Sequence, residues 1–445
     1  MTSNTGLRRK AWRSSALTVL QSQGENLFRL VSNLVLTRLL VPEAFGLMAI
    51  VQVFIAGLIM FSDLGIRGSI VQNRRGDEPD FLNTAWTMQI IRGFLLWIGA
   101  CLLSFPAAAI YDEPLLLQLL PVAGLTLIVT GFQTTNSYSA IRNLELGRVT
   151  VVELTAQVLG LVLIGILAWA LRSVWALAIG TVLAASLKVL LMHIFLTGIR
   201  NRFRLDRGSV SEIFRFGKYI FFTSLAAFLI RQSDRAILGA FLPLETFGVY
   251  NIGWVLASVP SLVAVALGEK VMFPLYRLRH PLDDIGNRRK IFAARRVVVA
   301  VLLLVSLFFA VFGIPAVEVL YDDRYILAGP IVVLMASALV PQIVTQGAIR
   351  AAVAKGDSRS FFIMMTSTSL LQVVLVYFGA RELGIFGAIL GVGAATILTY
   401  PLLALILRRY KSWDMWGDLT LFSLGAAAHF GACWWYREEI LQLLP

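Results

Sequence analysis

Apolar stretches of about twenty residues recur along almost the whole chain, and they restrict what it can fold into. A helix of that length crosses roughly 30 Å of hydrocarbon, whereas the strands of a membrane barrel read as shorter segments of alternating polarity. Of the 445 residues, 58% are hydrophobic and only 15% are charged, and the mean hydropathy is +0.78. Such a chain has too little polar surface to cover a soluble core, so the sequence predicts an all-α integral membrane protein.

Twelve membrane spans are predicted, and a less regular thirteenth follows them. In chain order the ranges are 14–39, 44–62, 83–110, 115–137, 150–171, 174–198, 214–239, 246–268, 291–314, 326–349, 360–380, 384–407 and 419–436. Most of the 39 Lys and Arg residues fall in alternate loops, and the opposite loops carry the acidic turns at residues 112–113 and 322–323. By the positive-inside rule this asymmetry predicts a cytoplasmic N-terminus. Polar residues interrupt the first span, so it is predicted to be a retained helix rather than a cleaved signal.

The sequence also repeats itself with an offset of roughly 210 residues. Ser139–Arg142 returns as Gly347–Arg350, and Tyr111–Glu113 returns as Tyr321–Asp323. Each copy holds an even number of spans, so both copies begin on the same side of the membrane and form a parallel repeat around a central cavity, as in many carriers. The predicted parts are an N-terminal lobe of six helices (1–200), a cytoplasmic linker (201–211), a C-terminal lobe with helices seven to twelve (212–410) and an additional helix with the C-terminus (411–445).

Charged residues inside the predicted spans are the first candidates for function, because charge is costly in hydrocarbon. In the first span Glu25 and Arg29 lie four residues apart with the acid first, which favours a helical ion pair. Together with Ser22, Ser32 and Asn33 they form one polar stripe along the helix. Such a stripe faces a cavity or a partner, or else the ion pair simply fixes the rotation of the helix.

The matching span of the second copy carries Arg231, Asp234 and Arg235, whose spacing places them on one helical face. One acid against two bases leaves a positive charge that an anionic ligand would neutralise. The alternative is that an acid on another helix, such as Glu25 or Glu153, pairs with the surplus arginine.

Six further charged residues complete the set of candidates: Arg92, Glu153, Lys188, Arg142, Arg350 and Asp63. The first three lie within or near spans. Arg142 and Arg350, which the repeat matches, lie at the cytoplasmic ends of spans, where each would meet a headgroup phosphate or complement a helix C-terminus. Asp63 ends a helix before a turn, with capping and ion coupling as the alternatives.

The sequence shows no nucleophile with a base, no phosphate-binding glycine loop and no set of metal ligands. We therefore expect no catalytic residue, no metal and no cofactor, and we expect a protein that is not an enzyme. The net charge of +13 is spread between the spans rather than gathered on one face, so nucleic acid is not an expected partner. Cys101 and Cys433 both fall inside apolar stretches and are expected to act as small hydrophobic residues.

Several motifs resemble those of a known family: Thr37–Gly46, Ser62–Ile66 leading to Ile70–Gln72, and Asp234–Gly239 followed by Phe247–Tyr250. The chain resembles the Wzx-type flippases for O-antigen and exopolysaccharide repeat units, within the multidrug/oligosaccharidyl-lipid/polysaccharide exporter superfamily. The resemblance implies two six-helix lobes that rock between inward-open and outward-open states in the bacterial inner membrane. It implies a polyprenyl-pyrophosphate-linked oligosaccharide as substrate, on the path to lipopolysaccharide or exopolysaccharide.

The same resemblance matches Asp234 and Arg235 to an acid-base step in the seventh helix of the family. The equivalent positions of the first half are Ser32 and Asn33, which are polar but uncharged. This departure leaves Arg29 as the candidate through which the first lobe would contact a phosphate.

Further partners and two alternative functions stay open at this point. Membrane lipids, a proton or sodium coupling ion and the polymerase or assembly proteins of a polysaccharide pathway are the further partners considered. A cation-coupled multidrug exporter of the same superfamily would use Glu25 or Asp234 as its acid, although cavity arginines would repel cationic drugs. A membrane glycan polymerase would need a cluster of carboxylates on a sizeable outer loop, and the outer loops here are short.

Overall fold

The computed structural model describes residues 24, 28, 30–62, 65–143 and 145–445, and of residues 215–223 it describes the backbone alone. Within these ranges every regular element is helical, which confirms the all-α prediction. The helices divide into two compact units, and the chain passes from one to the other between Leu225 and Ala226. This boundary lies inside one helix, α9 (Arg207–Phe241). The predicted domain limits at 200 and 212 stay a prediction.

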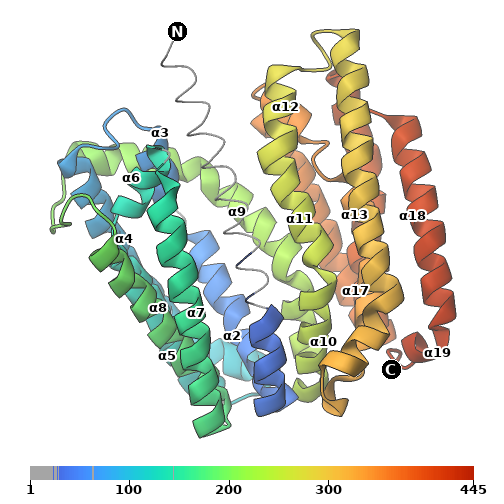
Figure 1. Cartoon of the computed structure of the whole chain (residues 1–445), viewed down its shortest axis with the longest axis horizontal. Helices are drawn as coiled ribbons and strands as arrows, with labels where there is room; N and C mark the ends of the chain where they lie inside the picture. The colour runs from blue at the N-terminus through green and yellow to red at the C-terminus, as the bar shows by residue number, and fades with distance from the viewer. Residues whose placement is uncertain (1–23, 25–27, 29, 63–64, 144) are drawn as a thin grey trace. The chain divides into compact units, whose positions relative to one another are not determined.

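The first unit is built from helices that pack in neighbouring pairs. In chain order they are α2 (Pro42–Phe61), α3 (Ile66–Gln72), α4 (Pro79–Tyr111), α5 (Leu116–Gly131), α6 (Asn136–Arg142), α7 (Leu146–Leu171), α8 (Val174–Phe195) and the first part of α9. A shorter apolar helix, Leu30–Leu39, precedes α2. Helix α4 packs along α5 and α7 packs along α8, while α5 contacts α8, as Figure 1 shows.

The second unit contains the rest of α9 and the helices that follow. These are α10 (Leu244–Ala257), α11 (Val259–Leu267), η1 (Gly268–Met272), α12 (Phe273–Leu278), α13 (Ile285–Leu320), η2 (Asp323–Tyr325), α14 (Ala328–Ala338), α15 (Val340–Thr345), α16 (Arg350–Ala354), α17 (Ser358–Arg409), α18 (Met415–Trp435) and α19 (Arg437–Leu441). Helix α13 packs along α14, and α18 contacts α13, α14 and α15. Helix α18 covers the range of the predicted thirteenth span and packs as a member of this unit, but it is not among the helices that are apolar enough to count as a candidate span.

Eight helices of the described part are long and apolar enough to cross a membrane, or nine if α5 and α6, bent by 58°, form one broken span. The predicted spans 360–380 and 384–407 lie in the single long α17. Leu383 and Gly384 interrupt it with non-helical backbone, and Gly384 has a φ of 59° that favours glycine.

The two halves of α17 approach each other closely near this break. A Cβ on Gly387 would collide with the backbone carbonyl of Gly379, and a Cβ on Gly391 would collide with that of Leu375. These contacts join residues on opposite sides of Gly384, so α17 forms two spans that fold back on each other. Small residues allow this approach where lipid gives no hydrophobic drive between helices.

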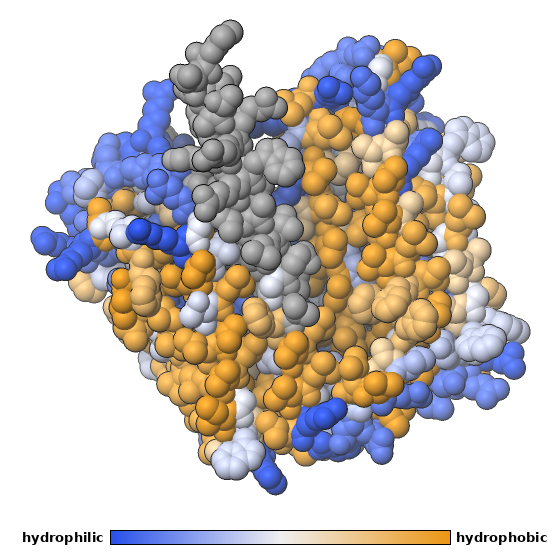
Figure 2. Space-filling model, in the orientation of Figure 1, coloured by the Kyte–Doolittle hydropathy of each residue, from blue (hydrophilic) through white to orange (hydrophobic). Residues whose placement is uncertain are grey.

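Apolar side chains cover the outside of each unit as well as its core. Leu102, Phe105, Leu304 and Trp435 are all more than 60% exposed. Figure 2 shows hydrophobic residues over the middle of the visible face of each unit and hydrophilic residues gathered at its ends. In water this surface would be unfavourable, whereas in a bilayer it faces lipid. The protein is a multi-pass membrane protein.

The segment between α8 and α9 has no regular structure, but its backbone is held in place by α4. The N–H groups of residues 202, 204 and 206 donate to side-chain oxygens at 2.8, 3.0 and 3.0 Å, which belong to Asn83, Thr87 and Thr84. Asp206 then accepts the N–H of Ser209 at 2.8 Å, where α9 begins. Hydrogen bonds from the Ser209 side chain and backbone hold the pKa of Asp206 below its ordinary value. The first residues of the predicted linker are thus attached to α4 of the first unit.

Candidate functional site

The acid and the base at the centre of the sequence prediction lie on α9 and contact different residues of α10. The Asp234 carboxylate accepts a hydrogen bond from the Tyr250 hydroxyl at 2.7 Å. The Arg235 guanidinium lies over the indole of Trp254, with Cζ 4.0 Å from the ring centroid. Adjacent residues on a helix point about 100° apart, so Asp234 and Arg235 do not pair with each other.

Both side chains are removed from solvent, since Asp234 is 3% exposed and Arg235 is 8% exposed. Arg235 Nη2 donates to the backbone carbonyl of Arg231 at 3.0 Å, and its Nε has no hydrogen-bond partner. Among the described residues, no acidic side chain forms an ion pair with Arg231 or Arg235. A cation–π contact with a desolvated indole contributes about 2 kcal/mol, whereas burying an arginine costs several kcal/mol. The positive charge of Arg235 is therefore only partly compensated.

A glutamine of α17 holds this part of α9 in position. Gln372 Nε2 donates to the carbonyl of Ile230 at 2.9 Å and to Ser233 Oγ at 3.0 Å. Gln372 is 3% exposed, and an amide in an apolar interior stabilises the structure when it is satisfied in this way. The rotation of α9 around Asp234 and Arg235 is thus fixed by contacts on two sides. Arg231 is exposed and carries no described side-chain contact.

Lys188 and Glu153, two further predicted residues, form an ion pair at 3.3 Å between α8 and α7. Glu153 was one of the acids considered as a partner for Arg231 or Arg235, and in the structure it contacts Lys188. Arg92 Nε donates to Ser62 Oγ at 3.0 Å, and its Nη2 donates to the carbonyl of Ile59 at 2.8 Å. These contacts link α4 to the end of α2.

The repeat-matched arginines Arg142 and Arg350 occupy similar places in their units. Arg142 Nε pairs with Asp77 at 2.9 Å, and its Nη1 donates to the carbonyl of Ile70 at 2.9 Å. Arg350 Nη2 pairs with Glu269 at 3.0 Å. Each acid lies between the second and third spans of its copy. The two alternatives for these residues, a headgroup phosphate and the complement of a helix C-terminus, stay predictions, and the structure adds a carboxylate partner for each side chain.

Three predicted residues, Glu25, Arg29 and Asp63, lie outside the described residues. Ser32 and Asn33 are described and lie in the helix Leu30–Leu39. The contribution of the first span to a binding site therefore stays a prediction.

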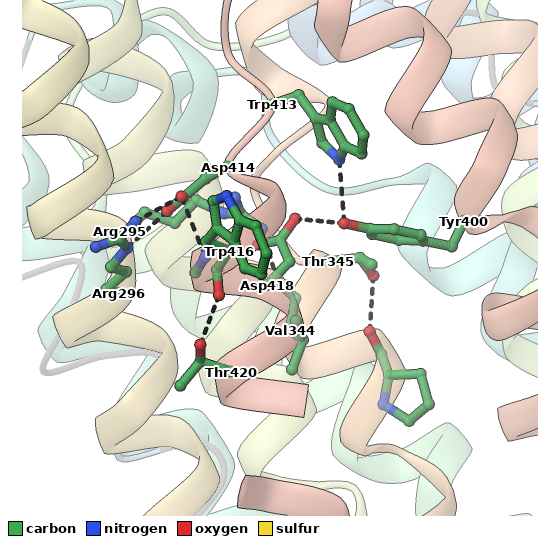
Figure 3. A network of polar contacts seen from close by, with 12 residues as sticks. Arg295, Arg296, Val344, Thr345, Tyr400, Trp413, Asp414, Trp416, Asp418 and Thr420 are labelled. Atoms are coloured by element: carbon green, nitrogen blue, oxygen red, sulfur yellow. Dashed lines mark hydrogen bonds and ion pairs between the residues drawn. The ribbon is translucent and has the colours of Figure 1, made fainter. Parts of the chain in front are cut away.

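The sequence analysis missed a buried polar network at the start of α18, which Figure 3 shows. Arg295 Nη2 donates to Asp418 Oδ1 at 2.6 Å, and Asp418 Oδ2 accepts the Tyr400 hydroxyl at 2.9 Å. Arg296 forms a two-point contact with Asp414 at 2.7 and 2.6 Å. Burial raises the pKa of Asp414, but the bonds from Arg296 outweigh this effect, so the pKa lies below its ordinary value.

The sequence does hold a signal for this network. Asp414 and Asp418 are four residues apart at the start of an apolar helix, and Arg295 and Arg296 are adjacent at the start of another. Both arginines lie inside the predicted span 291–314 and inside α13, but they were not among the candidate residues. The network joins α13, α17 and α18 and lies apart from Asp234 and Arg235 in sequence. Within the described residues, no group of three or more His, Cys, Asp or Glu side chains could hold a metal ion.

Comparisons with known proteins add the family context of these residues. A family model described as polysaccharide biosynthesis protein matches residues 35–330. The succinoglycan biosynthesis transport protein ExoT of Rhizobium meliloti (strain 1021) is 23% identical over 328 residues, which are 73% of this chain and 65% of that protein. The lipopolysaccharide biosynthesis protein WzxC of Escherichia coli (strain K12) is 25% identical over 252 residues, or 56% of this chain and 50% of WzxC. The match thus spans less than two thirds of the length of either relative.

Two solved structures have a similar fold. The lipid II flippase MurJ in an inward closed conformation matches with a TM-score of 0.67 at 12% identity, covering 95% of this chain and 100% of that one. An inward-facing multidrug resistance MATE family transporter of the MOP superfamily matches with a TM-score of 0.64 at 15% identity, covering 88% and 96%. At these identities the likeness concerns the fold alone, and it agrees with the predicted helical membrane architecture.

Proposed function

The chain belongs to the polysaccharide biosynthesis protein family, and from this premise we propose that it flips a polyprenyl-pyrophosphate-linked oligosaccharide across the bacterial inner membrane. The proposed mechanism is alternating access without a covalent step, so the protein would act as a transporter rather than an enzyme. ExoT is a succinoglycan biosynthesis transport protein and WzxC is a lipopolysaccharide biosynthesis protein, and both names support this substrate class. We keep the cytoplasmic N-terminus predicted from the loop charges as part of the proposal.

The observation that carries the proposal is the buried guanidinium of Arg235 without a carboxylate partner. Its neighbour Asp234 is 3% exposed and is engaged by Tyr250, so the acid next to it in sequence does not neutralise it. Arg231, one turn earlier, adds a second cation without a described acidic partner. A doubly anionic pyrophosphate is the ligand whose charge complements this pair.

The geometry of Arg235 suits phosphate recognition. Stacking on Trp254 occupies the face of the guanidinium, while its N–H donors lie in the plane and point outward from the edge. Nε is buried and has no hydrogen-bond partner in the structure, so this donor is unsatisfied until the surrounding side chains move and an acceptor reaches it. Two parallel N–H donors match two phosphate oxygens, an arrangement that a lysine cannot provide.

The other predicted cations contribute less to this proposal. Arg92, Lys188, Arg142 and Arg350 each have partners in the structure, and releasing them would cost the contacts described above. Arg29 is kept as a proposed second contact from the first span. A proton or sodium ion as the coupling ion and a polymerase as a partner also belong to the proposal, and neither has a described residue that supports it.

The test is flipping of a fluorescent polyprenyl-pyrophosphate oligosaccharide in reconstituted vesicles, with lectin access to the sugar as the readout. Arg235→Gln and Arg231→Gln are compared with the control Arg381→Gln, whose side chain is 60% exposed and pairs only with the adjacent Glu382. Loss of one charge-assisted contact costs about 1.5–3 kcal/mol, and each 1.4 kcal/mol is a factor of ten. We expect the flipping rate to fall about tenfold or more in each test variant and to stay unchanged in the control.

Folding is checked by size-exclusion elution, because Arg235 is buried. Arg235→Lys keeps the charge and loses the forked donors, so we expect an intermediate rate. Wild-type flipping in both the Arg231→Gln and Arg235→Gln variants would overturn the proposed site. Efflux of a cationic dye by the wild type, with no flipping of the sugar lipid, would overturn the proposed substrate and favour a multidrug exporter.

A further inference from the structure

An apolar groove lies between α7 and α8 in the first unit, with a volume of about 710 Å³. Helix α7 lines it with Arg148, Val151, Val152 and Thr155, and α8 lines it with Leu191 and Phe195. The four α7 residues follow the spacing of one helical face, so they form a continuous strip. All of these residues belong to one unit, and none takes part in the site on α9 and α10.

The floor of the groove is rigid and its walls are open. Val152 is buried in a cluster with Val149, Met192 and Leu196, so the two helices are locked together beneath the groove. Val151 is 63% exposed and Phe195 is 57% exposed. Closely packed interiors deform little, and the groove is therefore a preformed surface rather than a gap that side chains would close.

One end of the groove carries a cation. Arg148 lies in the first turn of α7, at the same end as Phe195, the last residue of α8. Arg148 Nη1 donates to Thr197 Oγ1 at 3.1 Å, and no acidic residue of the described chain pairs with it. From Arg148 to Thr155 the strip runs two helical turns, or roughly 10 Å at 1.5 Å per residue. Apart from the hydroxyl of Thr155, the rest of the strip is apolar.

We propose that this groove binds a polyprenyl phosphate, with the phosphate at Arg148 and the first isoprenoid units along Val151, Leu191 and Phe195. The inference rests on the proposed function, because it assigns the groove to the lipid end of the transported substrate. A flippase that holds this end at its surface keeps the polar head close to the protein. The groove would act as a waiting site that is separate from Arg231 and Arg235.

Charge and shape together point to this occupant. An anionic amphiphile with one chain places one charge at one end of a narrow apolar strip, and the groove has one cation at one end. Arginine donates to phosphate through its forked N–H groups, and a hydroxyl such as that of Thr197 is readily displaced by a charged acceptor.

The experiment measures binding to purified full-length protein by native mass spectrometry, with a long-chain polyprenyl monophosphate as probe and phosphatidylglycerol as competitor. Val151→Trp fills the groove, and its exposed position keeps the substitution out of the core. Arg148→Gln removes the cation. Val162→Trp is the matched control, because Val162 is also on α7, is 54% exposed and does not line the groove.

We expect Val151→Trp to abolish binding of the polyprenyl phosphate and Arg148→Gln to weaken it about tenfold, while Val162→Trp binds like the wild type. A hundredfold excess of phosphatidylglycerol should leave wild-type binding in place. Equal binding in Val151→Trp and wild type, equal loss in Val162→Trp, or displacement by equimolar phosphatidylglycerol would overturn the inference.

These outcomes separate the groove from the transport proposal. Specific binding that Val151→Trp abolishes, in a protein that flips no sugar lipid in vesicles, would overturn the proposed function and leave the groove as a prenyl phosphate site. Wild-type flipping together with unchanged binding in Val151→Trp would remove the groove and leave the proposed function intact.

Discussion

The buried pair of Arg295 and Asp418 makes a sharp prediction about stability. The two side chains are 3% and 5% exposed and meet at 2.6 Å, with Asp418 also held by Tyr400 and Arg295 also bonded to the carbonyl of Val344. Breaking such a pair from one side leaves a buried charge without its counter-charge, which costs about 3–5 kcal/mol. We expect that loss in Asp418→Leu and in Arg295→Met.

Removing both charges together should cost much less. A buried ion pair replaced by apolar residues of similar size is often neutral in stability, because the desolvation of both ions is removed as well. In the double variant Arg295→Met, Asp418→Leu we expect a net loss of about 1–2 kcal/mol, chiefly from the hydrogen bonds of Tyr400 and Val344 that lose their partner. The coupling energy of the pair should then be at least about 3 kcal/mol, well above that of independent sites.

The assay is reversible unfolding of the purified protein in mixed micelles, run as a double-mutant cycle. The exposed pair Arg381 and Glu382 provides the matched control, with side chains 60% and 68% exposed. Exposed pairs contribute about 0–1 kcal/mol, so its cycle should show almost no coupling. Single variants at Arg295 and Asp418 that each lose less than about 1 kcal/mol would refute the reasoning, because the pair would then behave as a solvated one.

Two further predictions concern α17. Asp357 precedes α17, where it accepts hydrogen bonds from the helix N-terminus and from Tyr410, and these bonds hold its pKa below the ordinary value. Because the pKa is lowered in the folded state, the carboxylate stabilises the fold above the unfolded pKa of about 3.9, and this effect is lost as the pH falls through the folded pKa. Asp357→Asn keeps a capping oxygen and removes the charge, so it should lower the Tm at pH 7 by an amount equivalent to about 0.5 kcal/mol. The difference in Tm from wild type should narrow below about pH 4. A constant gap would contradict this. Gly387→Ala should lower the free energy of unfolding by about 1–3 kcal/mol, because the new methyl group overpacks against Gly379. The control is Gly431→Ala, whose methyl group would meet nothing within 4 Å, so it should be neutral or stabilising in the same unfolding assay. Equal Tm values for both glycine variants would contradict the close approach.

Hydropathy and the repeat predicted the helical architecture because both depend on the sequence over long stretches. The fold-back of α17 was also predictable, since its glycines sit at helical spacing on either side of a short polar break. The bend of 58° between α5 and α6 was not predicted, although the predicted span 115–137 contains a polar run, Gln133 to Thr135, at the position of the break. Apolarity along the chain indicates burial in lipid and does not by itself indicate a straight helix.

Partner choice among the charged residues was the least predictable part. Glu153 and Lys188 lie 35 positions apart and meet only because α7 and α8 pack as neighbours. Asp234 and Arg235 are adjacent in the sequence, which suggests that they form an ion pair. Neighbouring residues of a helix do not face each other, however, so these two side chains do not pair. The sequence predicted a surplus cation among Arg231 and Arg235, but Trp254 and Tyr250 could be found only from the packing of α9 on α10.

The two copies of the repeat keep the same attachments and differ at the candidate site. Arg142 with Asp77 and Arg350 with Glu269 attach the connection between the second and third spans in both units. At the positions of Asp234 and Arg235, in contrast, the first copy has Ser32 and Asn33. An arginine that both copies contain, and that forms an ion pair with an acid in both, has a role that the two copies share, and the fold is what they share. This difference is why the proposed substrate contact rests chiefly on Arg235, which has no charged counterpart in the first copy, whereas Arg231 is matched at the same offset by Arg29.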